Sequence, residues 1–337
     1  MTPSAAARDT AVVLIAHGTV ESLDDLPEFL ANIRRGHAPP PELVEEVRRR
    51  YEVIGGRSPL LDITYEVARK LEARLGLPTR VAMRLFRPYP KEVIAKLAEE
   101  GIRRIVTVPL AQHSAGVYGA AMIAAAREVD PSIEILCAKN WGRTPELTGA
   151  FADAIVDALA KVPVGEEDRT ALVLTAHSLP LPIIQAGDPY EREFRASAED
   201  VVAEVRRRGG RFAEHVVAFQ SQGIGTGMEW LGPDLRTTLE QVAKRGTKHV
   251  VVAPIGFLAD HVEILYDLDV EAKGWCEGEE TKDLGMVLHR STSLNAGDGL
   301  IDALARVAGD VLARPDEHQA QAPRAGTPTR PGSTRGG

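Results

Sequence analysis

A row of acidic residues gives the first indication of chemistry. If a helix begins near Ala259, then Glu263, Asp267 and Glu271 recur at i, i+4 and i+8 and line one face of it. Carboxylates stacked in this way repel one another unless they face water or a cation. The row is therefore either a solvated helix face or a path that guides a divalent ion or removes protons. Carboxylate and imidazole ligands together suit Fe²⁺, and thiolates are absent from this segment.

Two histidines stand at the ends of similar apolar segments. His17 follows residues 11–16 and His177 follows residues 171–176, and the two heptapeptides share five of seven residues. A neutral imidazole at a strand end can accept a proton near neutral pH or bind a metal. The alternative for His177 is a structural histidine that forms a hydrogen bond at the start of a loop.

Arginines cluster after the first apolar segment. They occur in I-R-R-G at 33–36 and in R-R-R-Y at 48–51, and a Gly-rich turn at 54–60 follows that contains Ser58. Guanidinium groups can bind carboxylates through two hydrogen bonds, with Ser58 and backbone N–H groups as further donors. The plainer interpretation is that these arginines lie on a solvated helix surface.

The elements that position these residues follow an α/β pattern. Short runs rich in Val, Ile and Leu alternate with longer stretches of helical periodicity, which favours parallel sheets flanked by helices. Ligands of such sheets bind beyond the carboxyl ends of the strands, where both histidines stand. We predict strands near residues 11–16, 79–84, 103–109, 132–137, 170–176, 213–219, 248–254 and 284–289.

An internal repeat divides the chain in two. Besides the two histidine segments, residues 101–110 match residues 246–255 at an offset of 145. We predict two Rossmann-like domains, each with a four-stranded parallel sheet, at 10–162 and 169–313. The first holds an insertion at 21–58 that builds a substrate site, and the Pro- and Gly-containing tail, 314–337, is predicted to be disordered.

Composition excludes several classes of function. The 337 residues carry a net charge of −8, which argues against a nucleic-acid partner. The two cysteines, Cys137 and Cys276, form no C-x-x-C motif, so neither a disulfide framework nor a thiolate cluster is indicated, and a reducing cytoplasm fits. The N-terminus does not read as a signal peptide, and no run of 18 apolar residues predicts a membrane span.

The chain resembles ferrochelatases over about residues 11–314. The likeness is closest to coproporphyrin III ferrochelatases of the soluble type, which share I-R-R-G and end without a cysteine-ligated cluster domain. Six motifs carry it in family order: I-R-R-G (33–36), Y-E-V-I-G-G-R-S-P-L (51–60), A-H-S-L-P (176–180), G-D-P-Y (187–190), W-L-G-P-D (230–234) and G-F-L-A-D-H-V-E-I-L-Y-D-L-D (256–269).

The resemblance implies two Rossmann-like domains with a porphyrin bound between them. It also implies an enzyme, a lyase that inserts Fe²⁺ into that porphyrin during haem biosynthesis. Porphyrin and ferrous iron would be its substrates, no cofactor would be required, and no iron–sulfur cluster is expected. Other enzymes of the haem pathway are candidate partners.

Residue roles follow from the same resemblance. His177 and Glu263 match the family's metal and catalytic pair, and Asp267 and Glu271 would extend the metal path to solvent. The residues that fall where soluble members hold the porphyrin and its propionates are Arg34, Arg50, Tyr51 and Ser58.

Position 17 differs from the soluble members, which typically carry tyrosine in Y-G-T-P where this chain has His17-Gly18-Thr19-Val20. A histidine at this strand end resembles the smaller class II chelatases that act on sirohydrochlorin and related rings. We expect His17 to face the porphyrin from the side opposite His177 and to serve as an axial iron ligand. A loop histidine without contact to the ring is the alternative.

Three other interpretations stay open at this point. Coproporphyrin III is the favoured substrate because residues 21–51 are rich in charge and poor in apolar surface for a membrane, but protoporphyrin IX is the alternative. A porphyrin or haem carrier would use the same site without needing the acidic row. A two-lobed solute-binding protein is the third interpretation. Such a protein would ordinarily be exported, and the missing signal peptide speaks against it.

Overall fold

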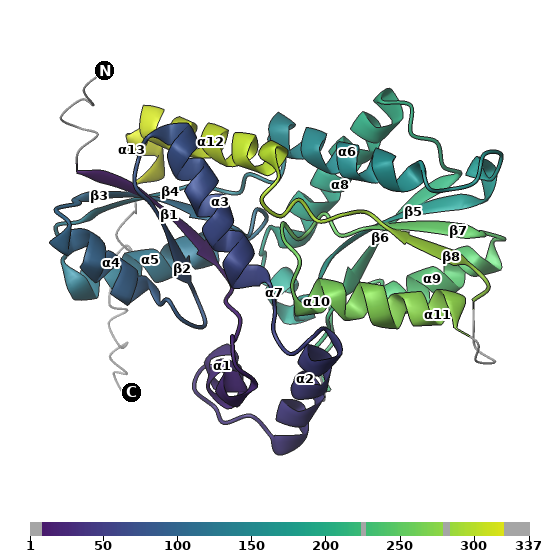
Figure 1. Ribbon diagram of the computed structural model, residues 1–337, viewed down its shortest axis with the longest axis horizontal. Helices are drawn as coiled ribbons and strands as arrows, with labels where there is room; N and C mark the ends of the chain where they lie inside the picture. The colour runs from purple at the N-terminus through teal and green to yellow at the C-terminus, as the bar shows by residue number, and fades with distance from the viewer. Residues whose placement is uncertain (1–8, 224–226, 279–283, 320–337) are drawn as a thin grey trace, which may run out of the picture.

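The protein is described here from a computed structural model that covers residues 9–223, 227–278 and 284–319. Two four-stranded, all-parallel sheets lie in its two halves with helices packed around them (Figure 1), so the predicted fold class is confirmed. All eight predicted strands are present. They are β1 (Thr10–Ala16), β2 (Thr79–Met83), β3 (Arg104–Pro109), β4 (Glu134–Cys137), β5 (Thr170–His177), β6 (Glu214–Gln220), β7 (His249–Ala253) and β8 (Val287–Arg290).

The two sheets have the same topology, as the repeat predicts. Their strand orders are β2-β1-β3-β4 and β6-β5-β7-β8. Both β1 and β5 are apolar along nearly their whole length because helices cover both faces of the sheet. Strand β1 pairs with β2 on one side and with β3 on the other. Strand β5 pairs in the same way with β6 and β7. In open parallel sheets, ligands bind beyond the carboxyl ends of the strands at such a reversal of strand order.

The helices follow the strands in a regular alternation. Those encoded in the first half are α1 (Leu26–Ile33), α2 (Pro41–Val53), α3 (Leu60–Leu75), α4 (Pro90–Glu99), α5 (Ala115–Val129) and α6 (Pro145–Leu159). The second half encodes α7 (Leu181–Gln185), α8 (Tyr190–Arg207), α9 (Leu235–Lys244), α10 (Val262–Leu265), a π-helix (Asp267–Ala272), α11 (Lys273–Glu277), α12 (Asp298–Ala313) and α13 (Pro315–His318).

The two halves exchange their last helices. Helix α6 comes from the first half but packs against α8 and the strands β7 and β8, whereas α12 comes from the second half and packs against α3 and β3. One hydrophobic core runs through both halves as a result, from Val12 to Val311. The predicted limits 10–162 and 169–313 therefore describe chain order and not two separate bodies.

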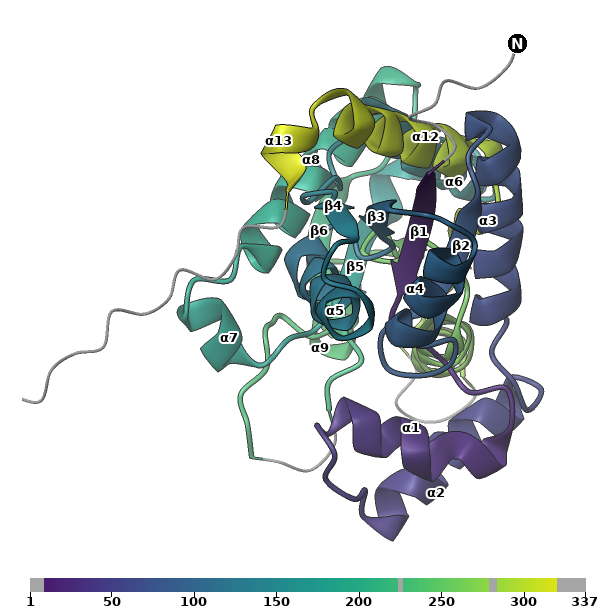
Figure 2. The same ribbon diagram turned by 90° about the vertical axis from the view of Figure 1, so that its left-hand side faces the viewer.

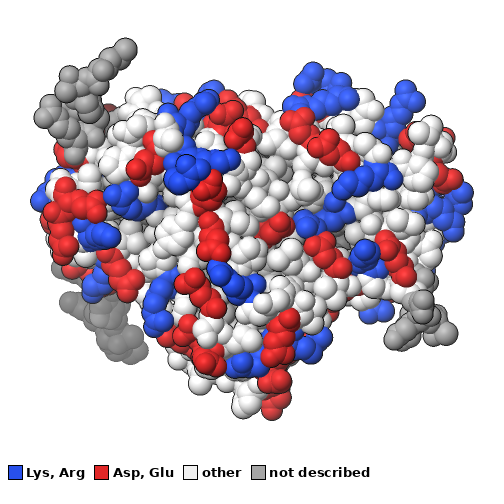
Figure 3. All heavy atoms as spheres, in the orientation of Figure 1, with Lys and Arg blue, Asp and Glu red and all other residues white. Residues whose placement is uncertain are grey.

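The insertion at 21–58 forms a small helical lobe. Helices α1 and α2 lie beyond the carboxyl end of β1 (Figures 1 and 2) and share a separate apolar cluster that includes Phe29, Tyr51 and Phe86. Figure 3 shows positive and negative side chains interspersed over the lobe on the face in view. The lobe therefore packs through this cluster against Phe86 and Val262, which lie outside it.

Two sequence predictions are corrected. The helix predicted to begin near Ala259 begins only at Val262, and the π-helix starts at Asp267, where the chain adopts wider i→i+5 turns such as Glu271 N–H to Tyr266 O. The predicted disorder from 314 is wrong at its start, because α13 is helical and Gln319 forms a β-bridge to Leu136. Residues 320–337 lie outside the described residues. No described helix is both long and apolar enough to cross a bilayer.

Candidate functional site

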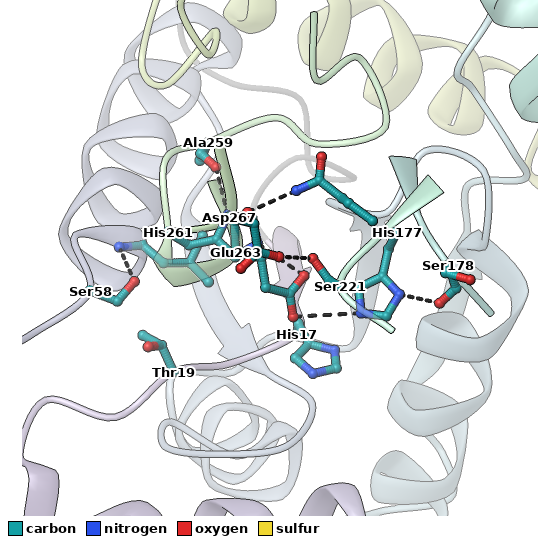
Figure 4. A network of polar contacts seen from close by, with 12 residues as sticks. His17, Thr19, Ser58, His177, Ser178, Ser221, Ala259, His261, Glu263 and Asp267 are labelled. Atoms are coloured by element: carbon teal, nitrogen blue, oxygen red, sulfur yellow. Dashed lines mark hydrogen bonds and ion pairs between the residues drawn. The ribbon is translucent and has the colours of Figure 1, made fainter. Parts of the chain in front are cut away.

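Three side chains meet where the carboxyl ends of the two sheets approach each other (Figure 4). His17 directly follows β1, His177 is the last residue of β5, and Glu263 lies in the first turn of α10, after β7. The switch point of each sheet thus presents one imidazole, and the second half adds the carboxylate. The sequence predicted His177 and Glu263 as a pair and His17 as a separate residue facing the porphyrin, and the structure places all three at this edge.

Glu263 lies between two imidazoles. Its Oε1 is 3.6 Å from Nε2 of His177, and its Oε2 is 3.6 Å from Nε2 of His261. His177 donates its Nδ1–H to the carbonyl of Ser178, and His261 donates its Nδ1–H to the carbonyl of Ala259 at 3.0 Å. These backbone contacts orient both rings so that Nε2 faces the carboxylate (Figure 4).

The electrostatics of this group assign protonation states. Burial alone would raise the pKa of Glu263, but the adjacent His177 and His261 outweigh it and hold the pKa well below the usual range. Burial would lower the pKa of His177, but the carboxylate of Glu263 reverses the effect and raises it to about 9. At neutral pH the pair is an imidazolium and a carboxylate. The neutral His177 expected from sequence is therefore not the resting form.

His17 has the opposite protonation state. Its ring keeps exposed surface, yet protein surrounds it on several sides, so desolvation is the largest effect and lowers its pKa to about 4. The nearby His177 and Arg84 act in the same direction. Nδ1 of His17 lies 3.4 Å from Oη of Tyr118, whose own pKa burial raises to about 12. His17 is therefore a neutral imidazole beside a neutral phenol.

Two donors, one from a strand and one from a helix, hold the main chain of the pair in place. Gln220, at the end of β6, donates its Nε2–H to the backbone carbonyl of Glu263 at 2.8 Å. Tyr190, at the start of α8, donates its hydroxyl to the backbone carbonyl of His177 at 2.8 Å. Each contact fixes the main chain that carries one member of the pair.

Asp267 and Glu271 lie along the π-helix beside a pocket. The pocket is lined in part by Arg50, Ser221, Asp267, Glu271 and Trp275. Arg50 lies 3.4 Å from Asp267, and Ser221 donates a hydrogen bond to the same carboxylate. Burial is nevertheless the largest effect and raises the pKa of Asp267 to about 7. The acidic row expected on one α-helix is thus divided between α10, which carries Glu263, and the π-helix, which carries Asp267 and Glu271 with an arginine beside them.

The residues predicted to hold the porphyrin occupy different environments. Tyr51 is 1% exposed and shares a 2.9 Å hydrogen bond with Thr19. Ser58 is 2% exposed, and its hydroxyl accepts the backbone N–H of Leu60. Arg34 is half-buried at the end of α1, and within the described residues its buried Nε has no hydrogen-bond partner. Of these side chains, Arg34 has unused hydrogen-bonding capacity.

Most other arginines of the lobe are already engaged. Arg49 and Arg50 both pair with Glu46, and both guanidinium groups lie over the ring of Tyr266. Arg48 donates to the carbonyl of Leu23. These contacts dock α2 on the segment that carries Asp267, so they tie the lobe to the second half of the chain.

Sequence reasoning missed several residues at the site. The contacts of Gln220, Ser221 and Tyr118 join positions 43 to 101 residues apart, and no motif or spacing marks them. His261 did carry a signal, since it stands two residues before Glu263. Across the described part of the chain, no three or more His, Cys, Asp or Glu side chains are grouped closely enough to hold a metal ion by themselves.

Asp267 provides a test of the site's electrostatics. Its raised pKa means that the folded protein binds this proton more tightly than the unfolded chain, so stability is lost as pH rises from about 4 to about 7. We expect Asp267→Asn to stabilise the protein at pH 8 more than at pH 5, by a difference on the order of 2 kcal/mol. Urea unfolding of the native protein and the variant at the two pH values measures this difference in stability. A variant that is less stable than the native protein at pH 8 would contradict the prediction.

Comparisons with known proteins identify the family of this chain. The family model described as Ferrochelatase matches residues 9–311. A ferrochelatase of Acidobacterium capsulatum is 36% identical over 94% of this chain and 98% of its own length. Proteins named coproporphyrin III ferrochelatase, from Geobacillus kaustophilus and Bacillus subtilis, are 35% and 32% identical over 88% and 90% of this chain and 94% and 98% of their own.

Solved structures share the fold at low sequence identity. SirB from Bacillus subtilis with Fe³⁺ aligns with a TM-score of 0.55 and 13% identity, over 92% of this chain and 98% of that chain. The sirohydrochlorin chelatase SirB in complex with cobalt aligns with a TM-score of 0.53, also at 13% identity, over 92% of this chain and 99% of that chain. These structures support the architecture. The sequence matches show that this chain belongs to the ferrochelatase family.

Proposed function

We propose that this chain inserts ferrous iron into coproporphyrin III, with Glu263, His177 and His17 at the reacting centre. The observation that best supports this is the convergence of an ionised carboxylate, an imidazolium and a neutral imidazole from both halves of the fold. Metallation replaces two pyrrole N–H protons with a dication, so the site needs proton acceptors that are unprotonated at neutral pH. A carrier would not need this set of groups.

The protonation states indicate which groups can accept the pyrrole protons. Glu263 is ionised and His17 is neutral, so these two groups can take protons from the ring, while His177 already holds a proton in its pair with Glu263. Arrival of Fe²⁺ beside Glu263 disfavours the imidazolium, so His177 would lose its proton as the metal enters. Asp267 and Glu271 extend the acidic row toward the pocket beside the π-helix, which supports a metal path on that side.

The choice of coproporphyrin III rests on two supports. Several relatives at 31–35% identity are named coproporphyrin III ferrochelatase. The lobe also carries Arg34, whose buried Nε has no hydrogen-bond partner within the described residues, and a guanidinium in this state can pair with a propionate. Arg50 faces Asp267 and Glu46 instead, so we assign it to the acidic row and not to a propionate.

We further propose that the enzyme works in the cytoplasm without a cofactor, and that other haem-pathway enzymes exchange porphyrin with it. Cys137 and Cys276 lie in different halves, in β4 and α11, so they do not form a pair of ligands for a cluster. Iron enters as substrate. Copurified iron–sulfur absorbance in the isolated protein would overturn the proposal on cofactors.

Glu263→Gln tests the carboxylate. It keeps the shape of the side chain and removes its charge, so we expect kcat to fall by roughly 100-fold or more while KM for the porphyrin stays nearly unchanged. Initial rates of Fe²⁺ or Zn²⁺ insertion measure this. Glu240→Gln, at an exposed glutamate of α9, is the matched control and should leave the rate unaltered. A comparable loss of porphyrin affinity would instead assign Glu263 to substrate binding.

His17→Phe tests axial ligation. If Nε2 of His17 binds iron in the product complex, the substitution removes that ligand and should shift the Soret and charge-transfer bands of the bound ferric product. Absorption spectra of the native protein and the variant, each loaded with ferric coproporphyrin, provide the comparison. Identical spectra would rule out ligation by His17 and leave it as a neutral group near the ring.

Substrate preference is tested by steady-state kinetics with two porphyrins. We expect kcat/KM for coproporphyrin III to exceed that for protoporphyrin IX, and Arg34→Gln to reduce the ratio by roughly 10-fold, as expected for one charge-assisted hydrogen bond. Arg306→Gln, at an exposed arginine of α12, serves as the control. A higher kcat/KM for protoporphyrin IX in detergent would overturn the substrate assignment and leave the metallation reaction intact.

A further inference from the structure

A guanidinium outside the reacting centre joins the two ends of the segment that carries Glu263. Arg290, the last residue of β8, donates its Nε–H to Asp269 at 2.6 Å and its Nη1–H to Asp260 at 3.2 Å. The side chains of Arg290 and Asp260 are only 18% and 20% exposed. A partly buried arginine that pairs with two carboxylates through hydrogen bonds is a strong and directional contact.

The loop after β8 completes the surroundings of Asp260. Ser293 donates its hydroxyl to Oδ1 of Asp260 at 2.7 Å, and Asn295 donates its Nδ2–H to Oδ2 at 2.9 Å. Asn295 also accepts the backbone N–H of Asp260 at 2.8 Å. The carboxylate and main chain of Asp260 are thus held from three directions by residues of one loop.

The position of the two carboxylates makes this network relevant to the reaction. Asp260 stands three residues before Glu263, and Asp269 lies six residues after it within the π-helix. The segment between β7 and α10 has no regular structure to fix its path, and α10 is a single turn. π-Helices are rare and occur mostly as single turns, often at functional sites. The orientation of this segment, and that of Glu263, must therefore come from tertiary contacts.

We propose that Arg290 is a positioning residue for metallation: it clamps the loop before Glu263 to the π-helix after it and so sets the carboxylate opposite His177. The inference rests on the proposed role of Glu263. Arg290 itself contacts neither His177 nor Glu263 among the described interactions. Its effect must pass through the segment, which makes it separable by experiment from a direct role.

A double-mutant cycle tests the clamp. Arg290→Gln should lower kcat by roughly 10- to 100-fold, the loss expected when a reacting group moves by about 1 Å, with KM for coproporphyrin III nearly unchanged. In a Glu263→Gln background the same substitution should have little further effect on the residual rate, because the group it positions is gone. An equal loss of kcat in both backgrounds would overturn the proposal and make Arg290 a structural residue.

Two further variants serve as a substitute and a control for Arg290→Gln. Ser293→Ala removes one donor to Asp260 without changing charge, so if Arg290→Gln fails to fold it provides the same cycle with a smaller loss. Arg306→Gln is the matched control, since Arg306 also lies near two carboxylates, Asp310 and Glu146, but far along α12. It should leave kcat unaltered, and a loss of kcat equal to that of Arg290→Gln would contradict the clamp.

The outcomes separate the inference from the function it rests on. If Glu263→Gln retains full activity, the proposed role of Glu263 fails. If Glu263→Gln loses activity while folded Arg290→Gln keeps normal kcat, only the clamp fails. Thermal unfolding of each variant shows which proteins are folded during the assays.

Discussion

The site depends on keeping one carboxylate ionised where protein surrounds it. Burial of Glu263 opposes its charge, and only the imidazoles of His177 and His261, each with Nε2 at 3.6 Å, reverse that effect. The carboxylate in turn raises the pKa of His177 to about 9. Neither protonation state exists without the other, so the pair acts as one unit whose charges change together when a dication arrives.

The internal repeat places two equivalent histidines in different surroundings. His17 and His177 stand at equivalent strand ends, yet their pKa values are about 4 and about 9. At the repeat offset of 145, the position equivalent to Glu263 is Tyr118, and Tyr118 is the residue whose hydroxyl approaches His17. Burial is the largest effect on His17 and outweighs the attraction of Glu263, which acts on this ring too. His177 differs because Glu263 lies directly beside it, at 3.6 Å, and reverses the effect of burial.

The sequence predicts what local patterns determine and misses what distant contacts determine. The eight strands and the positions of His17 and His177 follow from apolar runs and from the repeat, and Glu263 follows from the spacing of the acidic row. The start of α10 and the π-helix could not be predicted. Asp260, just before α10, is held by Arg290 and Asn295, which belong to a strand and a loop about 30 residues later in the chain. Likewise, nothing local distinguishes Arg34, with its unpartnered Nε, from Arg50, which pairs with Asp267 across 217 residues.

The exchange of α6 and α12 bears on how a flat macrocycle can be strained. Bending a porphyrin requires a frame that does not yield, because strain in the ring must be balanced by binding elsewhere on it. The crossed helices place both sheets on one continuous core, and Gln112 of the first half donates to the carbonyl of Ile255 in the second at 2.9 Å. Relative motion of the halves would disrupt that core. The packing of this core therefore sets the distance between His17 and the pair formed by His177 and Glu263. Free energy gained by binding the propionates can then distort the porphyrin ring without displacing the two halves of the protein.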